Sequence, residues 1–409
     1  MRSTLKQYVY RPGDAEYEQV SGLGPAAVAF PRSPAEAAAV VRTATVEGLR
    51  VAPIGSGQNT GPFGDLSDTV LVRTGYLNTY DFNRRIARVG AGATWGPLVD
   101  VLGKRGLAVL HGSSPDTGVV GYTLGGGVGW YGRALGLAAN TVAAVELVTA
   151  DGGLVRADES HEAELFWALR GGGGGNYGLV TALELRLEWI RNVYAGMLVW
   201  DLRDAERVLP QWAEWAANAP DAVTTVYRQV QFPVSPDIPE ALRGRRLVII
   251  GGAVLASDGE AEQMLGPLRR LRPRLDTFRR GPARELVEMH ADTPAPGGVQ
   301  SVLLREAPSV DRLLADSSFE LRQLGGALSH SAPDAGALDQ LDGQFLLLAD
   351  ERTVEAMAPW ASGQNYLPFT HRRVDPATGF APEVWPLLRQ IRRRVDPSGV
   401  FRANHEIPL

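Results

Sequence analysis

The fold of this chain is decided by the stretch Gly112-Ser113-Ser114-Pro115-Asp116-Thr117-Gly118-Val119-Val120-Gly121-Tyr122-Thr123-Leu124-Gly125-Gly126-Gly127-Val128-Gly129. Glycine has no side chain, so main-chain N–H groups beside it can approach a ligand closely, and the backbone can adopt positive φ. Consecutive N–H groups in such a loop form a concave nest that favours anions such as a pyrophosphate. The stretch therefore predicts a site for a phosphorylated ligand.

Two further glycine-rich stretches lie on either side of it. The earlier one reads Ile54-Gly55-Ser56-Gly57-Gln58-Asn59-Thr60-Gly61, and the later one reads Arg170-Gly171-Gly172-Gly173-Gly174-Gly175-Asn176-Tyr177-Gly178. Three such loops in one half of the chain indicate a large phosphorylated cofactor that is held along its length.

Composition narrows the class of protein. The 409 residues are 44% hydrophobic and 21% charged, as in ordinary globular proteins, and the net charge of -5 gives no reason to expect a nucleic-acid partner. No apolar run approaches the ~20 residues of a membrane span, and the first residues lack the apolar core of a signal peptide, so we expect a cytoplasmic protein without a membrane partner. The absence of cysteine excludes disulfides and thioether bonds to a cofactor, and with only 6 histidines we expect no metal site.

The pattern of elements changes near residue 191. Before it, residues 27–52 read as strand, helix and strand, with Ser33-Pro34 as the helix start and Gly48 at its end. After it, strand-like runs at 195–202, 224–232 and 247–255 alternate with helix-like runs at 204–218, 258–271 and 311–314. This order predicts an α+β fold whose second domain, residues 191–355, has an antiparallel sheet covered by helices.

The glycine stretches in this order, together with the run from Val395 to Pro408 that includes Asn404, resemble the berberine-bridge-enzyme-like branch of the vanillyl-alcohol-oxidase flavoprotein family, with its PCMH-type FAD-binding domain. Motifs at 132–140, 147–152, 166–173 and 321–328 agree with it. The resemblance covers about 27–190 and 360–409 and is weak between them. It implies a two-part FAD-binding domain, residues 1–190 and 356–409, and a central domain that roofs the flavin to form a substrate pocket.

The resemblance assigns FAD contacts to residues of all three glycine stretches and of the C-terminal segment. They are Ile54, Gly55, Ser56, Gly57, Gln58, Asn59, Gly112, Ser113, Ser114, Thr117, Gly118, Gly121, Tyr122, Thr123, Gly126, Gly127, Gly174, Gly175, Asn176, Gly178, Val180, Asn365 and Asn404.

Two of these positions concern how the cofactor is attached. Family members usually carry a His where this chain has Gln58 and a Cys where it has Ser114, and both residues bond covalently to the flavin. Neither bond can form here, so we predict non-covalent FAD and a flavin that is a weaker oxidant. Thr117 stands where valine admits oxygen to the flavin and leucine obstructs it. Because threonine has nearly the shape of valine, the resemblance favours an oxidase that uses molecular oxygen.

The catalytic base is sought in the dipeptide Asn365-Tyr366, where many relatives have a tyrosine that takes a substrate proton. A tyrosine pKa of about 10 must be lowered by a neighbour for that role at neutral pH. The alternative is that Tyr366 only packs its ring. Other relatives use a Glu, His or Tyr of the central sheet, so Tyr227, Gln229 and His290 are candidates for the substrate pocket. His111 is expected to be structural, and the run Arg392-Arg393-Arg394 a solvated helix face.

The expected reaction is removal of a hydride from a C–H bond next to oxygen or nitrogen, with FAD as acceptor and hydrogen peroxide as the second product. The resemblance implies a secondary-metabolite or sugar-like substrate, and oxidative cyclisation is a further possible outcome. The alternatives are a dehydrogenase, a cyclase without net oxidation, and a binding protein that has lost turnover. Sequence pattern does not indicate the oligomeric state.

Overall fold

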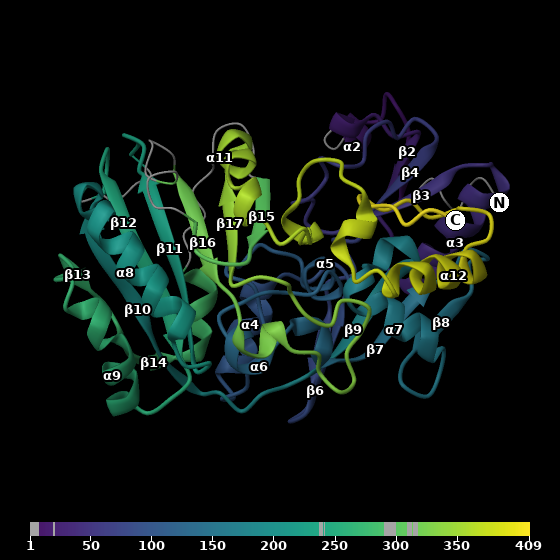
Figure 1. Ribbon diagram of the computed structural model, residues 1–409. Helices are drawn as coiled ribbons and strands as arrows, with labels where there is room; N and C mark the ends of the chain where they lie inside the picture. Colours follow the sequence, from purple (N-terminus) through teal and green to yellow (C-terminus); the bar gives the residue numbers. More distant parts are fainter. Residues whose placement is uncertain are drawn as a thin grey trace.

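Three β-sheets organise the part of the protein that the structure describes (Figure 1). The computed structural model describes residues 8–18, 21–236, 240, 242–289, 300–308, 313 and 318–409. The first sheet has the order β1-β2-β4-β3 and the second β5-β6-β9-β7-β8. Their strands are β1 (Val9–Tyr10), β2 (Ala27–Ala29), β3 (Arg50–Ile54), β4 (Thr69–Arg73), β5 (Tyr80–Phe82), β6 (Ile86–Gly90), β7 (Val142–Val148), β8 (Leu154–Ala157) and β9 (Leu179–Arg186).

The third sheet takes its strands from residues 192–349 and is antiparallel throughout. Its order is β13-β10-β12-β11-β16-β17-β15, with β14 also paired to β10. The strands are β10 (Asn192–Asp201), β11 (Val223–Gln231), β12 (Arg246–Val254), β13 (Leu275–Asp276), β14 (Arg279–Pro282), β15 (Gln300–Leu304), β16 (Phe319–Gln323) and β17 (Phe345–Ala349). This sheet confirms the predicted α+β class.

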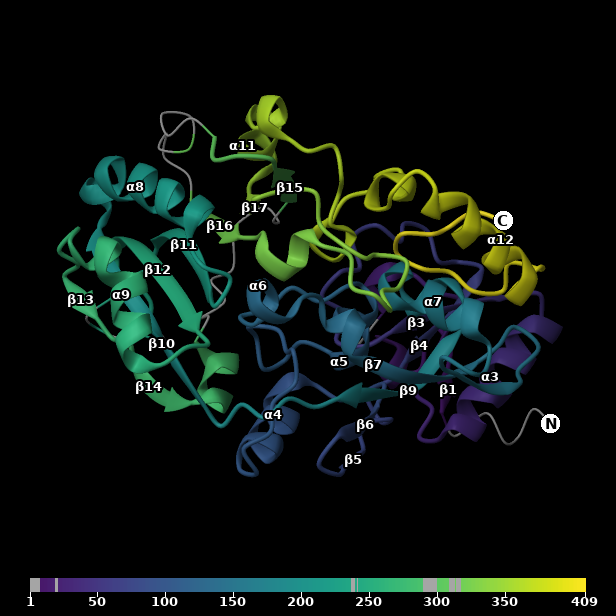
Figure 2. The ribbon, with the colours of Figure 1, turned by 60° about the horizontal axis from the view of Figure 1, so that its bottom comes forward.

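The helices cover these sheets. They are α2 (Ala15–Glu18), α3 (Pro34–Val46), α4 (Trp95–Gly103), α5 (Val119–Leu124), α6 (Gly132–Leu135), α7 (Ala163–Gly172), α8 (Ala205–Asn218), α9 (Asp258–Arg269), α11 (Glu351–Ala356) and α12 (Val384–Val395). Figure 2 shows α8 and α9 on one side of the large sheet, and the apolar residues of both helices share a core with β10, β11 and β12. The opposite face of that sheet is left for the site.

Local sequence explains how the chain reaches the first glycine stretch. The Ser33 hydroxyl accepts a hydrogen bond from the Glu36 N–H at 3.2 Å and Pro34 opens α3. Gly48 has a φ of +71°, which lets the chain turn sharply after the helix. The alanines and valines of α3 pack on the first sheet and hold β3 in place. This strand ends at Ile54, directly before the loop.

The C-terminal segment returns to the first sheet. Val51 and Phe401 form a parallel bridge, and the N–H of Val51 donates to Val400 O at 2.7 Å. In Figure 1 helix α12 lies beside α7. The expectation of a solvated arginine run is wrong for Arg392, which is fully buried and pairs with the equally buried Asp396 at 3.1 Å. The amphipathic helix α12 buries one face, and Arg392 lies on that face with Leu388 and Ile391.

Some expected elements differ from the structure. The strand expected within 321–328 ends at Gln323, because Gly325 and Gly326 have φ values of +81° and +57° and begin a turn. The helix expected at 311–314 lies outside the described residues except for Leu313. Within the described part of the chain, no helix is long and apolar enough to cross a membrane.

Candidate functional site

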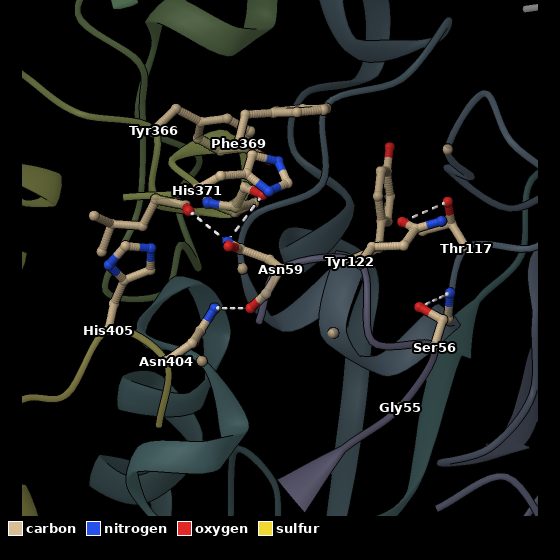
Figure 3. Close-up of a pocket in the computed structure, with 18 of the residues that line it drawn as sticks. Gly55, Ser56, Asn59, Thr117, Tyr122, Tyr366, Phe369, His371, Asn404 and His405 are labelled. Carbon is tan, nitrogen blue, oxygen red and sulfur yellow. Dashed lines mark hydrogen bonds between the residues drawn. The ribbon is translucent and has the colours of Figure 1, made fainter. Parts of the chain in front are cut away.

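A cavity of about 830 Å³ separates the glycine stretches from the large sheet (Figure 3). All three glycine stretches line one side of it, and the C-terminal segment adds residues 366–369, 371 and 403–405. The other side is formed by residues of β11, β16 and β17. Its size is within the range of pockets that bind cofactors and small molecules. The sequence elements predicted to act together therefore surround one space.

Hydrogen bonds join the first two glycine stretches at the cavity. The Thr117 hydroxyl donates to Gln58 Oε1 at 3.1 Å. The N–H of Gly118 donates to Ser56 Oγ at 3.3 Å. Figure 3 shows both contacts on the side of Tyr122 away from Asn59. These bonds hold the two loops in a fixed relation although about sixty residues separate them.

Asparagine side chains attach the C-terminal segment to the first and third loops. Asn59 Nδ2 donates to the carbonyl oxygen of Leu367 at 3.1 Å, and Asn404 Nδ2 donates to Asn59 O at 3.0 Å (Figure 3). Asn176 Nδ2 donates to His405 O at 3.1 Å. An asparagine suits this task because its amide offers donors and an acceptor to neighbouring backbone. The cavity wall is thus closed by residues from both ends of the sequence.

Most of the residues predicted to contact FAD line the cavity. Those that do are Ile54, Gly55, Ser56, Gly57, Gln58, Asn59, Gly112, Ser113, Ser114, Thr117, Gly118, Gly121, Tyr122, Gly174, Gly175, Asn176, Gly178, Val180 and Asn404.

Four others, Thr123, Gly126, Gly127 and Asn365, are not among the residues that line the cavity. Thr123 is fully buried, and Asn365 Nδ2 donates to Thr378 Oγ1 at 2.8 Å. Gly126 and Gly127 have φ values of +117° and +78°, so glycine is required at both positions for the backbone conformation of the turn. The glycine pattern does not distinguish a residue that contacts a ligand from one that only turns the chain.

The cavity wall fits a phosphorylated cofactor. A Cβ added to Gly121 or Gly173 would meet no protein atom within 4 Å, so open space lies in front of both. Asn59 Oδ1 is buried and has no hydrogen-bond partner. Lining residues from Pro53 to Val180 carry no charged side chain, which leaves main-chain N–H groups and polar side chains to meet phosphates.

Tyr366 lies at the cavity and is almost fully buried. Its hydroxyl oxygen accepts a hydrogen bond from the Gly127 N–H at 3.0 Å, and its ring lies 5.6 Å from that of Phe369. Burial raises the pKa of Tyr366, although the Gly127 N–H and the positive charge of Arg322 act in the opposite direction. Tyr366 is therefore protonated in the resting protein, in contrast to the lowered pKa expected for a resting base.

Charged side chains from the large sheet face the cavity, and the sequence analysis did not single them out. Arg228 is opposite Glu320 in the β11–β16 register, and Glu320 forms an ion pair with Arg322. The Arg322 guanidinium lies 4.7 Å from the centre of the Phe369 ring. Alternating positions of a strand face the same side. Glu320 and Arg322 alternate with the buried residues Phe319 and Leu321. This alternation could have placed both charged side chains on the face opposite the core.

The same alternation corrects the expectation for Tyr227. Its side chain lies on the opposite face of the sheet, fully buried, with ring centres 5.4 Å from Trp212 and 5.7 Å from Phe319. Its hydroxyl accepts from Gln229 Nε2 at 3.3 Å. Gln229 borders the cavity, but its side chain lies on the same face as Tyr227 and bonds to it there. His290 lies outside the described residues.

Two histidines near the site have lowered pKa values. His111 is buried beside the second glycine stretch, its Nδ1 lies 2.6 Å from Gly112 O, and burial lowers its pKa to about 4. It does not line the cavity, in keeping with the structural role expected for it. His371 lines the cavity, and burial lowers its pKa too. Among the described residues, no group of three His, Cys, Asp or Glu could hold a metal ion.

Comparison with known proteins agrees with this geometry. Residues 25–158 match the family model of an FAD binding domain. The uncharacterized FAD-linked oxidoreductase YgaK of Bacillus subtilis (strain 168) is 27% identical over 373 residues, which cover 81% of this chain and 79% of YgaK. Glucooligosaccharide oxidase of Sarocladium strictum is 32% identical over 202 residues, covering 47% of this chain and 40% of that protein.

The fold is that of the BBE-like 1 protein of Physcomitrella patens. The two structures agree with a TM-score of 0.84 at 20% sequence identity, over 100% of this chain and 99% of the other. The resemblance to berberine-bridge-enzyme-like proteins is thereby confirmed for the fold. The match to the FAD binding domain confirms FAD as the cofactor.

Proposed function

We propose that this protein, an FAD-dependent oxidoreductase, is an oxidase that takes a hydride from a C–H bond next to oxygen or nitrogen of a polar small molecule. One observation carries the proposal. The cavity has the glycine stretches and Tyr366 on one side and Glu320 and Arg322 of the large sheet on the other. A substrate placed between them would contact the cofactor and a set of proton-transfer groups at once.

Two residues of this chain are candidates for the proton transfer that accompanies hydride loss from an alcohol. When bound, FAD supplies the hydride acceptor, and oxygen takes the electrons to give hydrogen peroxide. Tyr366 can take the alcohol proton only if its phenolate is stabilised, which the Gly127 N–H and Arg322 favour. Glu320 offers a carboxylate on the opposite wall. Oxidation of a neutral amine needs neither residue as a base, because the nitrogen lone pair assists hydride loss.

The polar wall of the large sheet supports a polar substrate. Arg228, Glu320 and Arg322 offer donors and acceptors to hydroxyl groups. The name of the glucooligosaccharide oxidase relative points the same way. We therefore favour a sugar-like compound or a hydroxylated secondary metabolite, with oxidative cyclisation as a further outcome of the same hydride loss.

Oxygen as the electron acceptor is supported by Thr117. Its hydroxyl is engaged by Gln58, so the rest of the side chain has the branched shape of valine at the cavity wall. Non-covalent attachment is supported by the side chains of Gln58 and Ser114, since neither offers an imidazole or a thiolate.

The proposal is tested by mixing the purified protein anaerobically with panels of sugars, secondary alcohols and amines. A substrate should bleach the flavin spectrum, and admitting air should restore it with formation of one peroxide per turnover. Bleaching that persists in air but is reversed by a dye acceptor would identify a dehydrogenase instead. Product formed without bleaching would indicate chemistry without net oxidation, and binding without any product would indicate a silent protein.

A further inference from the structure

Arg73 is a cation placed beside the first glycine stretch. It ends β4 and is the register partner of Ile54, which ends the parallel strand β3. Its Nη1 atom lies 3.3 Å from the point where a Cβ on Gly57 would stand. Gly57 has a φ of +82° and lines the cavity. The guanidinium is thus held against the loop that turns from the sheet towards the cofactor site.

The positive charge of Arg73 has no anionic partner within the part of the chain that the structure describes. No hydrogen bond or ion pair to its guanidinium is found there, whereas Arg402 pairs with Asp68 and Arg50 with Glu406. Burial lowers the pKa of Arg73, and no carboxylate opposes that effect. A partly buried cation without a counter-ion is unfavourable unless a ligand supplies the charge.

The wall of the cavity needs such a charge. Its lining residues from Pro53 to Val180 include no charged side chain, yet FAD brings a pyrophosphate dianion to this domain. Without a cation, only main-chain N–H groups and uncharged polar side chains would stabilise its negative charge. We propose that Arg73 is the electrostatic partner of the FAD pyrophosphate, acting at Gly57 of the first glycine stretch. The proposal rests on FAD as the cofactor and does not depend on which substrate is oxidised.

The test is FAD binding to apoprotein produced under riboflavin limitation, followed by quenching of flavin fluorescence at several salt concentrations. Replacing a charge-assisted contact by a neutral one should raise the Kd for FAD ~10-fold or more in Arg73→Gln at low salt, with less loss in Arg73→Lys. The salt dependence of binding should fall in Arg73→Gln. Binding of riboflavin, which lacks phosphate, should not change.

The matched control is Arg32→Gln, which removes the same charge from an exposed side chain that lies over the Tyr76 ring. Its Kd for FAD should equal that of the parent protein. Unchanged FAD binding in Arg73→Gln would overturn the proposal, as would equal weakening of FAD and riboflavin. If Arg73→Gln does not fold, two other measurements test the proposal. They are the salt dependence of FAD binding to Arg73→Lys and the competition of ADP with FAD in the parent protein. ADP that fails to compete contradicts a pyrophosphate site.

Discussion

The hydroxyl of Thr117 donates to Gln58 Oε1 at 3.1 Å, although 59 positions separate the two residues in the sequence. This bond links the two glycine stretches at Gln58, one of the two residues from which we predict non-covalent FAD. It also occupies the hydroxyl hydrogen of Thr117, so this group does not donate to another partner. The pair therefore bears on both the attachment of FAD and the access of oxygen.

Oxygen access can be tested at Thr117 itself. Thr117→Val keeps the branched shape and should leave reoxidation of the reduced flavin by oxygen within about twofold of the parent rate. Thr117→Leu adds volume at the cavity wall and should slow reoxidation ~10-fold or more, an effect of about 1.4 kcal/mol on the barrier. Stopped-flow mixing of reduced protein with oxygenated buffer measures both. Equal rates for Val and Leu would remove Thr117 from oxygen control.

Non-covalent attachment predicts that acid precipitation releases the cofactor. Flavin absorbance should move from the protein pellet to the supernatant, because neither Gln58 nor Ser114 can bond to it. Mass spectrometry of the denatured protein should give the mass of the bare chain. Flavin retained in the pellet would reveal a linkage at another residue.

Proton transfer is tested with Tyr366→Phe and Glu320→Gln. Loss of a general base costs ~10²–10⁴-fold in kcat/KM, and the loss should fall on the variant that lacks the true base. Anaerobic flavin reduction in a stopped-flow instrument isolates the hydride step. Tyr227→Phe is the control, because its hydroxyl lies on the far face of the sheet, and it should keep the parent rate. If neither site variant slows reduction, the substrate is oxidised without a protein base.

Steric fit of the cofactor is tested at Gly121. A Cβ there meets no protein atom within 4 Å and borders the cavity, so a leucine side chain has room to enter it and Gly121→Leu should raise the Kd for FAD by ~10-fold or more. The apoprotein should not lose stability, because removing a helical glycine gains about 0.5–1 kcal/mol. Gly75→Leu is the control, with equally open surroundings outside the cavity lining. Fluorescence titration and thermal unfolding separate the two effects.

Acid should destabilise the protein through His111. Folded His111 stays neutral down to about pH 4, whereas the unfolded chain takes up a proton below about 6.5. The unfolded state therefore binds more protons than the folded state between these pH values. As the pH is lowered from about 6.5 to about 4, this group reduces the free energy of unfolding by on the order of 3 kcal/mol. Denaturant unfolding of His111→Gln should show a flatter profile in this window.

Much of the FAD side was predictable from sequence because glycine and the helix-start residues Ser33 and Pro34 act locally. The substrate side was not, because it depends on which face of each strand meets the cavity. Tyr227 and Arg228 are neighbours in sequence yet lie on opposite faces of β11. The prediction that Arg392 is solvated was wrong for a related reason. Sequence periodicity does not reveal that a charged residue on a buried helix face has a buried partner, here Asp396.

The return of the C-terminal segment has a consequence for biosynthesis. Val400, Asn404 and His405 form hydrogen bonds with Val51, Asn59 and Asn176, so the wall around the cofactor includes residues that are made long after the glycine loops. A nascent chain that ends before residue 400 has the glycine loops but no closed wall. A complete FAD site therefore depends on contacts between residues far apart in the sequence, and folding of the glycine loops alone does not build it.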